Sequence, residues 1–564
     1  MNDLEITRLK ELEHIRDVAA RYEIPESELM LFGESKAKVR LSLMDRLKDR
    51  PDGRYVVVTA ITPTPLGEGK TVNTVGLSLG LNKIGKKAVC TIRQPSMGPV
   101  FGIKGGAAGG GYSQVVPSED FNLHLTGDFH AISAAHNLCA AFADTSLLLD
   151  NPHDLSPERL TIRRVVDMND RALRDIEVGL GGDKNGVPRR TGFDITSASE
   201  IMAIMGLSEG YADLKRRLQR MVVGTNSQGE TVTAKDLQCS GAMAALLKDS
   251  IMPTIMQTLE GTLSFVHTGP FANIAHGNSS IIADRMALKV ADYVVTEAGF
   301  GADMGCEKFF NIKCRASGLR PDCAVLVATV RGIKFNSGRY KVVPGKPLPE
   351  EMLAENLDDL AHGISNLEAQ MENVQMHGVP VVVAVNRFPT DHDSEIEYLV
   401  QKAKDLGAHD AVVSECHAKG GAGAIELAEA VRAAAESDEA DFHLLYPDEA
   451  TLEEKILTLA LRIYGAARVE YASGVRDKLQ EFDRRGYGRF PICMAKTQYS
   501  LSHDPKLKGR PHDFVFPIVD VRAAAGAGYV YPLAGKIMTM PGLGRHPGGM
   551  GIDLDDEGQI HGLF

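Results

Sequence analysis

The feature that most constrains the fold is a run of β-branched residues joined to a helix by a turn-rich loop. Residues 55–61 form a continuous apolar run, typical of a strand buried on both faces. The loop covers 62–71, and helical periodicity then extends from Lys70 to about Ile84. A second apolar run at 87–92 completes a βαβ unit, whose crossover is expected to be right-handed.

Further apolar runs of strand length predict that this unit is part of a larger sheet. They lie at 291–296, 323–330, 379–385 and 411–414. Helical periodicity at 353–375 and 424–435 alternates with them, which predicts a mostly parallel sheet with helices on both faces. Residues 3–22 carry apolar side chains at helical spacing and predict one amphipathic helix.

The sequence pattern changes near residue 455, and a second approximate boundary lies near 360. Together these boundaries predict three domains. Beyond 455, short strand-like pieces at 514–521 and 529–533 mix with Gly- and Pro-rich turns. The predicted fold class is therefore α/β. We expect a mostly parallel-sheet P-loop nucleotide-binding domain at 1–360, a smaller α/β domain at 361–455 and an α+β domain at 456–564.

The loop before the first helix predicts a nucleoside triphosphate site. It ends in Gly69-Lys70-Thr71, the end of a G-x-x-x-x-G-K-[ST] pattern, with Thr64 in the leading glycine position. Backbone N–H groups of such a loop bind phosphate oxygens, the Lys neutralises charge and the hydroxyl ligates Mg²⁺. The alternative is an ordinary strand–helix turn with a chance G-K-T.

A second glycine cluster follows the second predicted strand. Residues 98–111 hold seven glycines and include Lys104, while Arg93 lies just past the strand. Ligands in parallel sheets collect beyond the carboxyl ends of strands, so Arg93 is expected near the phosphates, where a guanidinium suits a second oxyanion. The alternative is a flexible loop with solvated cations.

Three histidines and a carboxylate come next: His124, Asp128, His130 and His136. Their spacing matches no H-E-x-x-H metal motif. Metal ligation, structural hydrogen bonding and acid–base or substrate contacts all stay open for them.

Two later loops also follow predicted strands. Residues 386–391 are weakly similar to the N-K-x-D guanine-binding motif, with a longer spacing between Asn and Asp, and 415–421 are Gly-rich. Each is either a ligand loop or an ordinary βα connection.

Charge and cysteine usage exclude other classes of partner. The 74 acidic and 62 basic residues give a formal net charge of −12, the wrong sign for a protein dedicated to nucleic acid. No apolar run reaches the roughly 18–20 residues of a bilayer span. The charge and the short apolar runs predict neither nucleic-acid nor membrane partners. Eight cysteines without a C-x-x-C pair are typical of a reduced cytoplasmic protein.

Longer motifs closely resemble those of the formate–tetrahydrofolate ligase (formyltetrahydrofolate synthetase) family. They are TPTPLGEGKT at 62–71, FGIKGGAAGGGY at 101–112, HLTGDFHAISAAHN at 124–137, TEAGFGADMGCEKF at 296–309, VATVRGIK at 327–334, MAKTQYSLS at 494–502 and MTMPGLGRHP at 538–547. The likeness extends over essentially the whole chain.

The resemblance implies a reaction and its small-molecule substrates. Formate, ATP and tetrahydrofolate would give 10-formyltetrahydrofolate, ADP and phosphate through formyl phosphate. It also implies Mg²⁺ with the ATP, stimulation by a monovalent cation, a homotetrameric assembly and two smaller α/β domains beside a nucleotide-binding domain, with 361–455 contributing to the folate site.

The resemblance also implies roles for individual residues. Arg93 would hold formyl phosphate and Asp128 would lie in the folate site, where it or His130 is a candidate base; Phe388 and His417 would sandwich the pterin ring. Lys70 would contact the transferring phosphate and Thr71 the Mg²⁺. The ATP phosphate loop would comprise Thr64, Pro65, Leu66, Gly67, Glu68, Gly69, Lys70 and Thr71.

The sequence departs from the family pattern at a few positions. His417 replaces a Trp in a chain that has no Trp, and Gln94 replaces a Glu beside Arg93. Gly332, Ile333 and Ser337 replace the more usual Ala, Leu and Gly.

Three further activities stay open on residue chemistry alone. They are another P-loop ligase that activates a carboxylate, a nucleotide-switched assembly protein and a metal hydrolase that uses the histidines at 124–136.

Overall fold

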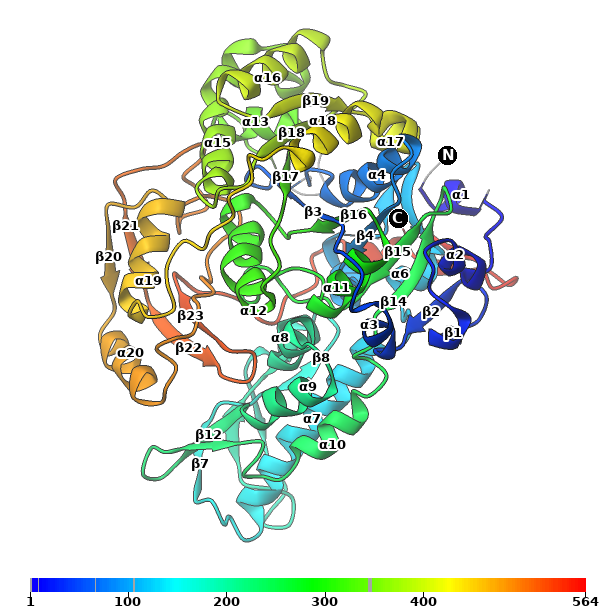
Figure 1. Ribbon diagram of the computed structural model, residues 1–564. Coiled ribbons are helices and arrows are strands. Elements are labelled where there is room, and N and C mark those ends of the chain that lie inside the picture. The colour runs from blue at the N-terminus through cyan, green and yellow to red at the C-terminus, as the bar shows by residue number, and fades with distance from the viewer. Residues whose placement is uncertain (1–2, 9, 66, 105–106, 343–346, 564) are drawn as a thin grey trace.

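The protein is a mixed α/β fold built around one large sheet (Figure 1). The computed structural model describes residues 3–8, 10–65, 67–104, 107–342 and 347–563. In those residues the sheet has twelve strands and is mostly parallel, as the sequence predicts. The finer division into a P-loop domain and two smaller domains stays a prediction.

Seven neighbouring strands of the sheet are parallel to one another. In spatial order they are β15 (Leu263–Val266), β4 (Ala88–Ile92), β16 (Tyr293–Glu297), β3 (Arg54–Ala60), β17 (Cys323–Ala328), β18 (Val381–Asn386) and β19 (Asp410–Ser414). Antiparallel β14 (Thr254–Thr258), β2 (Lys36–Val39) and β1 (Leu29–Phe32) extend it beyond β15. All six apolar runs predicted as strands belong to the parallel part.

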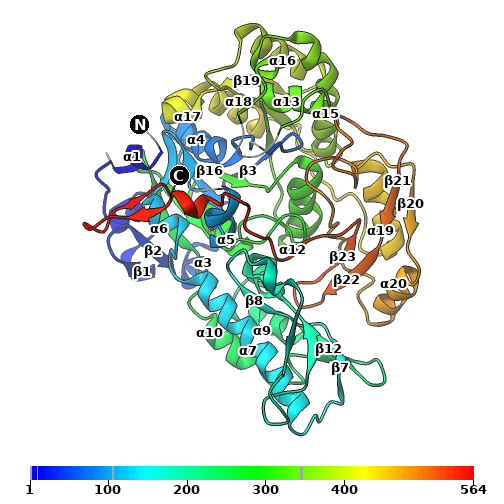
Figure 2. The ribbon, with the colours of Figure 1, turned by 180° about the vertical axis from the view of Figure 1, so that it is seen from behind.

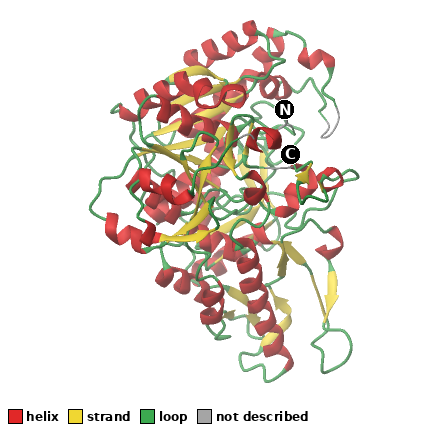
Figure 3. Cartoon of the chain, turned by 90° about the vertical axis from the view of Figure 1, so that its right-hand side faces the viewer, coloured by secondary structure: helices red, strands yellow, loops and turns green. Residues whose placement is uncertain are grey.

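Helices cover both faces of the parallel strands (Figure 3). In β3, Val56 and Val58 pack on one face with side chains of α4 (Lys70–Lys83) and α18 (Ile425–Glu436). Val57 lies in the opposite core, together with residues of α11 (Ile281–Val290), α15 (Leu357–Gln375) and α16 (Asp393–Asp405). With both faces covered, the carboxyl edge of the strands is where a ligand is expected.

The central sheet continues across the predicted boundary near residue 360. That boundary falls inside α15. Beyond it, β18 pairs with β17, and β19 pairs with β18.

Two smaller units flank the sheet. One, at the bottom of Figure 1, holds α7 (Asp128–Leu148), α8 (Glu200–Leu207) and a small sheet of β7 (Leu155–Leu160), β12 (Val222–Asn226) and β13 (Thr231–Thr233). The sequence pattern does not predict these short strands. The other has its own apolar core, formed around α19 (Leu452–Thr458), α20 (Val475–Arg484), β20 (Arg468–Tyr471), β21 (Val515–Ile518), β22 (Asp520–Ala524) and β23 (Tyr529–Leu533).

Residues 3–8 lie close to the described C-terminal segment around residue 560 (Figure 2). The Arg8 guanidinium donates to the carbonyl oxygen of Ile560 at 2.6 Å. No helix within the described ranges combines the length and the apolarity that a bilayer crossing requires.

The prediction of one helix over 3–22 is wrong. The segment forms α1 (Asp3–Arg8) and α2 (Ile15–Arg21), with residues 11–14 outside any helix. The backbone of Glu13 exchanges two hydrogen bonds, of 3.2 and 2.7 Å, with the side chain of Gln257 in β14. This attachment to the sheet replaces the hydrogen bonds that a continuous helix would make there.

A partly buried carboxyl joins the lower unit to the C-terminal unit. Glu200 accepts hydrogen bonds from the backbone nitrogens of Gly526 at 2.6 Å and Ala527 at 3.3 Å. Burial raises the pKa of Glu200 from its ordinary 4.5 to about 7, against the opposing effect of these two bonds.

We predict that Glu200→Gln stabilises the protein at alkaline pH. The folded state holds the Glu200 proton between about pH 4.5 and 7 while the unfolded chain has released it, so stability falls as pH rises through this window. The loss is on the order of 3 kcal/mol. Thermal unfolding from pH 4.5 to 8 should show the variant gaining on the wild type only above about pH 5. Equal midpoints at pH 8, or the same gain from the exposed control Glu209→Gln, would contradict this.

Candidate active site

The predicted phosphate loop lies at the carboxyl end of β3 and leads directly into α4. Gly67 and Gly69 have φ values of 76° and 77°, in the left-handed region that side chains disfavour. The backbone nitrogen of Thr64 donates to the buried Glu68 carboxylate at 2.9 Å, which closes the loop on itself. Leu66 lies outside the described residues.

Two neighbouring elements hold this loop from the β17 and β18 side. The Thr329 hydroxyl donates to Glu68 Oε2 at 2.6 Å. The Asn386 amide, at the end of β18, donates to the Glu68 backbone carbonyl at 3.2 Å. The loop at 386–391 therefore begins with a direct contact to the phosphate loop.

The carboxylate of Glu297 connects the phosphate loop with Arg93. Glu297 ends β16, which lies between β3 and β4, so it faces the loops that follow both strands. Arg93 Nη2 donates to Glu297 Oε1 at 3.1 Å, and the Thr71 hydroxyl donates to Glu297 Oε2. Arg93 Nη1 also donates to the Pro270 carbonyl at 3.2 Å.

The electrostatics of this cluster favour an ionised Glu297. Burial alone would raise the pKa of its carboxyl. The charge of Arg93, the Thr71 hydroxyl and the charge of Lys70 together lower the pKa by more than burial raises it, so the net shift is downward. The structure thus brings Lys70, Thr71 and Arg93 together around one buried carboxylate. A hydroxyl, a carboxylate and two cations at a phosphate loop can bind a Mg²⁺-associated polyphosphate.

Asp128 lies in a different environment, a buried ion pair at the start of α7. Its carboxylate is 2.8 Å from the Lys38 ammonium, and the two side chains are 3% and 0% exposed. Lys38 also donates to the Met252 carbonyl at 2.9 Å. None of the contacts found in the described part of the chain joins Asp128 to Glu297 or Arg93.

The nearby histidines do not form a metal cluster. His124 and His130 are exposed, whereas His136 is buried and its Nε2 lies 2.8 Å from the Arg163 carbonyl. Burial lowers the pKa of His136. In the described ranges no group of three or more His, Cys, Asp or Glu side chains is arranged to hold a metal ion.

Phe388 and His417 follow adjacent strands at the same edge of the sheet. β18 and β19 pair in parallel, and the Arg387 backbone nitrogen donates to the Ser414 carbonyl at 3.0 Å. The Arg331 guanidinium covers one face of the Phe388 ring, with Cζ 3.6 Å from the ring centroid. The His417 side chain, in α17 (Cys416–Lys419), is 58% exposed and lies 3.8 Å from Asp3.

The end of the second glycine cluster packs against His417. The Tyr112 nitrogen donates to the His417 carbonyl at 2.9 Å, and a Cβ on Gly111 would lie 2.0 Å from that oxygen. Gly111 therefore serves a close approach of two backbone segments. Gly105 and Gly106 of the cluster lie outside the described residues, and so does the side chain of Lys104.

Comparison with known proteins gives the family. The model of the formate–tetrahydrofolate ligase family matches residues 1–564. The chain belongs to this family. It is 56% identical to the formate–tetrahydrofolate ligase of Roseiflexus sp. (strain RS-1) over 563 residues and 54% identical to that of Cutibacterium acnes over 564, with both chains fully covered. The Saccharopolyspora erythraea enzyme is 55% identical over 562 residues, all of this chain and 99% of its own.

In this formate–tetrahydrofolate ligase family member, the sequence alone did not single out Glu297 as a site residue. It occurs in the motif at 296–309, which carried the family resemblance but no assigned role. An acidic residue directly after a buried apolar run was the available signal, because that position lies at the carboxyl end of a strand. The sequence could not show that this strand separates β3 from β4.

We predict that Asp128→Asn destabilises the protein, because it leaves the Lys38 charge buried without a partner. The expected loss of unfolding free energy is about 3–5 kcal/mol, measured by urea denaturation. Replacing both partners, as in Lys38→Met with Asp128→Leu, should recover most of it. A single variant as stable as the wild type would show that this pair is not a structural contact.

Proposed function

We propose that this protein joins formate to N10 of tetrahydrofolate, converts ATP to ADP and phosphate, and releases 10-formyltetrahydrofolate. Family membership over the entire chain supports the overall reaction. The observation that supports the proposed chemistry is the contact of Glu297 with both Arg93 and Thr71. It joins the candidate nucleotide site to the candidate formate site.

The first step transfers the γ-phosphoryl group of ATP to a formate oxygen and gives formyl phosphate. This step depends on positioning and charge neutralisation more than on covalent catalysis. The loop from Thr64 to Thr71 binds the phosphates with its backbone N–H groups, and Lys70 neutralises charge on the group in transfer. Gly67 and Gly69 allow the backbone to turn toward the phosphates.

The residues present fit the Mg²⁺ that accompanies ATP. The Thr71 hydroxyl and the Glu297 carboxylate lie in hydrogen-bonding contact and are the oxygen ligands that this ion prefers. When bound, the ion neutralises charge on the phosphates. The resemblance also implies a monovalent cation. At position 94, where the family has a carboxylate, this chain has the buried amide of Gln94.

Arg93 binds the formyl phosphate in the second step. Its guanidinium is fixed before substrate arrives, by Glu297 and by the Pro270 carbonyl. A donor held in place stabilises developing charge without reorganising during the reaction.

The folate is bound beside the phosphate loop. Phe388 stacks on the pterin ring and His417 contacts its other side; both follow strands that end at the same edge of the sheet. The proposed acceptor of the N10 proton is Asp128, which must exchange its contact with Lys38 for the substrate amine.

A substrate-omission assay tests the proposed reaction. ADP release should require formate and tetrahydrofolate together with ATP, and Arg93→Ala should abolish formyl transfer while the protein still binds ATP. Arg54→Ala, at the opposite end of β3, is the matched control and should keep activity. ADP release in the absence of formate, or near-normal turnover of Arg93→Ala, would contradict the proposal.

We predict that Glu297→Gln lowers kcat about a hundredfold or more, a size typical of a lost electrostatic contact in an active site. The amide keeps the shape of the side chain but removes the charge that fixes Arg93, and the Mg²⁺ concentration for half-maximal activity should rise. Glu307→Gln, at a buried glutamate that instead accepts from Asn311, controls for burial. Wild-type activity and Mg²⁺ dependence in Glu297→Gln would contradict the role of this carboxylate.

A further inference from the structure

Arg331 lies between the phosphate loop and the ring of Phe388. Its Cζ is 3.6 Å from the ring centroid, and its Nη2 donates to the Gly67 carbonyl at 3.1 Å. Its Nε is buried and has no hydrogen-bond partner among the described residues. One face of the Phe388 ring is therefore covered by a guanidinium that is itself attached to the phosphate loop.

One carboxylate from each of the two loops interacts electrostatically with this guanidinium. Burial lowers the pKa of Arg331. The charges of Glu68, in the phosphate loop, and Asp391, in the loop after β18, act in the opposite direction and raise it. Asp391 also accepts a hydrogen bond from the Phe388 backbone nitrogen at 2.8 Å. The cation thus interacts with both loops that it lies between.

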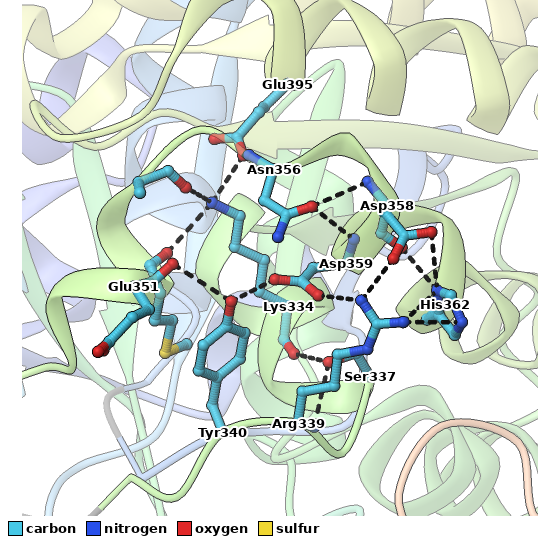
Figure 4. Close-up of polar contacts among 12 residues, drawn as sticks. Lys334, Ser337, Arg339, Tyr340, Glu351, Asn356, Asp358, Asp359, His362 and Glu395 are labelled. Atoms are coloured by element: carbon cyan, nitrogen blue, oxygen red, sulfur yellow. Dashed lines mark hydrogen bonds and ion pairs between the residues drawn. The ribbon is translucent and has the colours of Figure 1, made fainter.

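The helix that carries Arg331 is fixed at both ends. In α13 (Val330–Asn336), the Thr329 cap accepts from the Gly332 nitrogen at 2.9 Å and donates to Glu68. Near the other end, buried Lys334 lies 2.6 Å from Glu395 and donates to two backbone carbonyls (Figure 4). Arg331 accordingly has little freedom to move relative to the phosphate loop.

We propose that Arg331 is a positioning residue for the folate substrate. It occupies one face of Phe388, leaves the opposite face for the pterin ring and holds that ring at a fixed place relative to Gly67. The inference rests on the proposed function, in which Phe388 stacks on the pterin. Because a planar guanidinium stacks on a ring and a Lys ammonium does not, the side chain's shape matters as well as its charge.

Steady-state kinetics of the full-length enzyme test this proposal with Arg331→Lys, Phe388→Leu and the double variant. Arg331→Lys should raise the KM for tetrahydrofolate about tenfold, because the ammonium cannot stack on the Phe388 ring as the guanidinium does, and change the KM for ATP less than about twofold. In the Phe388→Leu background, Arg331→Lys should have no further effect on the KM for tetrahydrofolate, because the two residues act as one unit.

The matched control is Arg339→Lys. Arg339 pairs with Asp358 and Asp359 and lies against His362, in contacts that do not include the phosphate loop or Phe388 (Figure 4). This variant should leave both KM values unchanged. Melting temperatures of all variants separate a loss of folding from a loss of positioning.

Three results would overturn the proposal. They are an unchanged KM for tetrahydrofolate in Arg331→Lys, an equal rise of both KM values, and an effect of the same size with and without Phe388. Failure of the proposed function would appear instead in the wild-type enzyme, as ADP release that does not depend on formate and tetrahydrofolate.

Discussion

The contact of one buried carboxylate with two loops is the interaction on which the rest of the site depends. A carboxylate removed from water is costly unless charged and hydrogen-bonding groups compensate it, and Glu297 receives both from Arg93 and Thr71. These two residues follow different strands, β4 and β3, and β16 lies between them. The strand order therefore determines that Glu297 is the side chain able to join them.

A second set of contacts fixes the phosphate loop from the opposite direction. The Glu68 carboxylate accepts a hydrogen bond from Thr329, the cap of α13. The Asn386 amide, at the end of β18, donates to the Glu68 backbone carbonyl. The loop is thus held between β16 on one side and α13 with β18 on the other. Groups that are fixed before the substrate arrives lose less conformational entropy on binding. Transfer of a group between two bound substrates depends on such fixed positions.

Much of the central sheet could be predicted from sequence because its strands are buried on both faces and read as unbroken apolar runs. The strands found at Arg54–Ala60 and Cys323–Ala328 lie within two residues of the predicted runs. The short strands of the lower unit lack this signal, since β7 and β12 are only partly buried. The split of residues 3–22 into two helices depends on Gln257, which is distant in sequence and forms a contact that periodicity cannot report.

The site was predictable in part for the same reason. Lys70, Thr71 and Arg93 follow recognisable strands, so their meeting at one sheet edge follows from the topology. Neither Glu297 nor Arg331 belongs to a general motif; their roles depend on which strands are neighbours and on where α13 begins.

A crystal structure of the protein with Mg²⁺, formate and a nonhydrolysable ATP analogue would test the central claim most directly. We expect the terminal phosphate between Lys70 and Arg93, the metal ion on the Thr71 and Glu297 oxygens, and the Glu297–Arg93 contact retained. Phosphates bound away from the loop between β3 and α4, or an Arg93 side chain turned away from them, would contradict it.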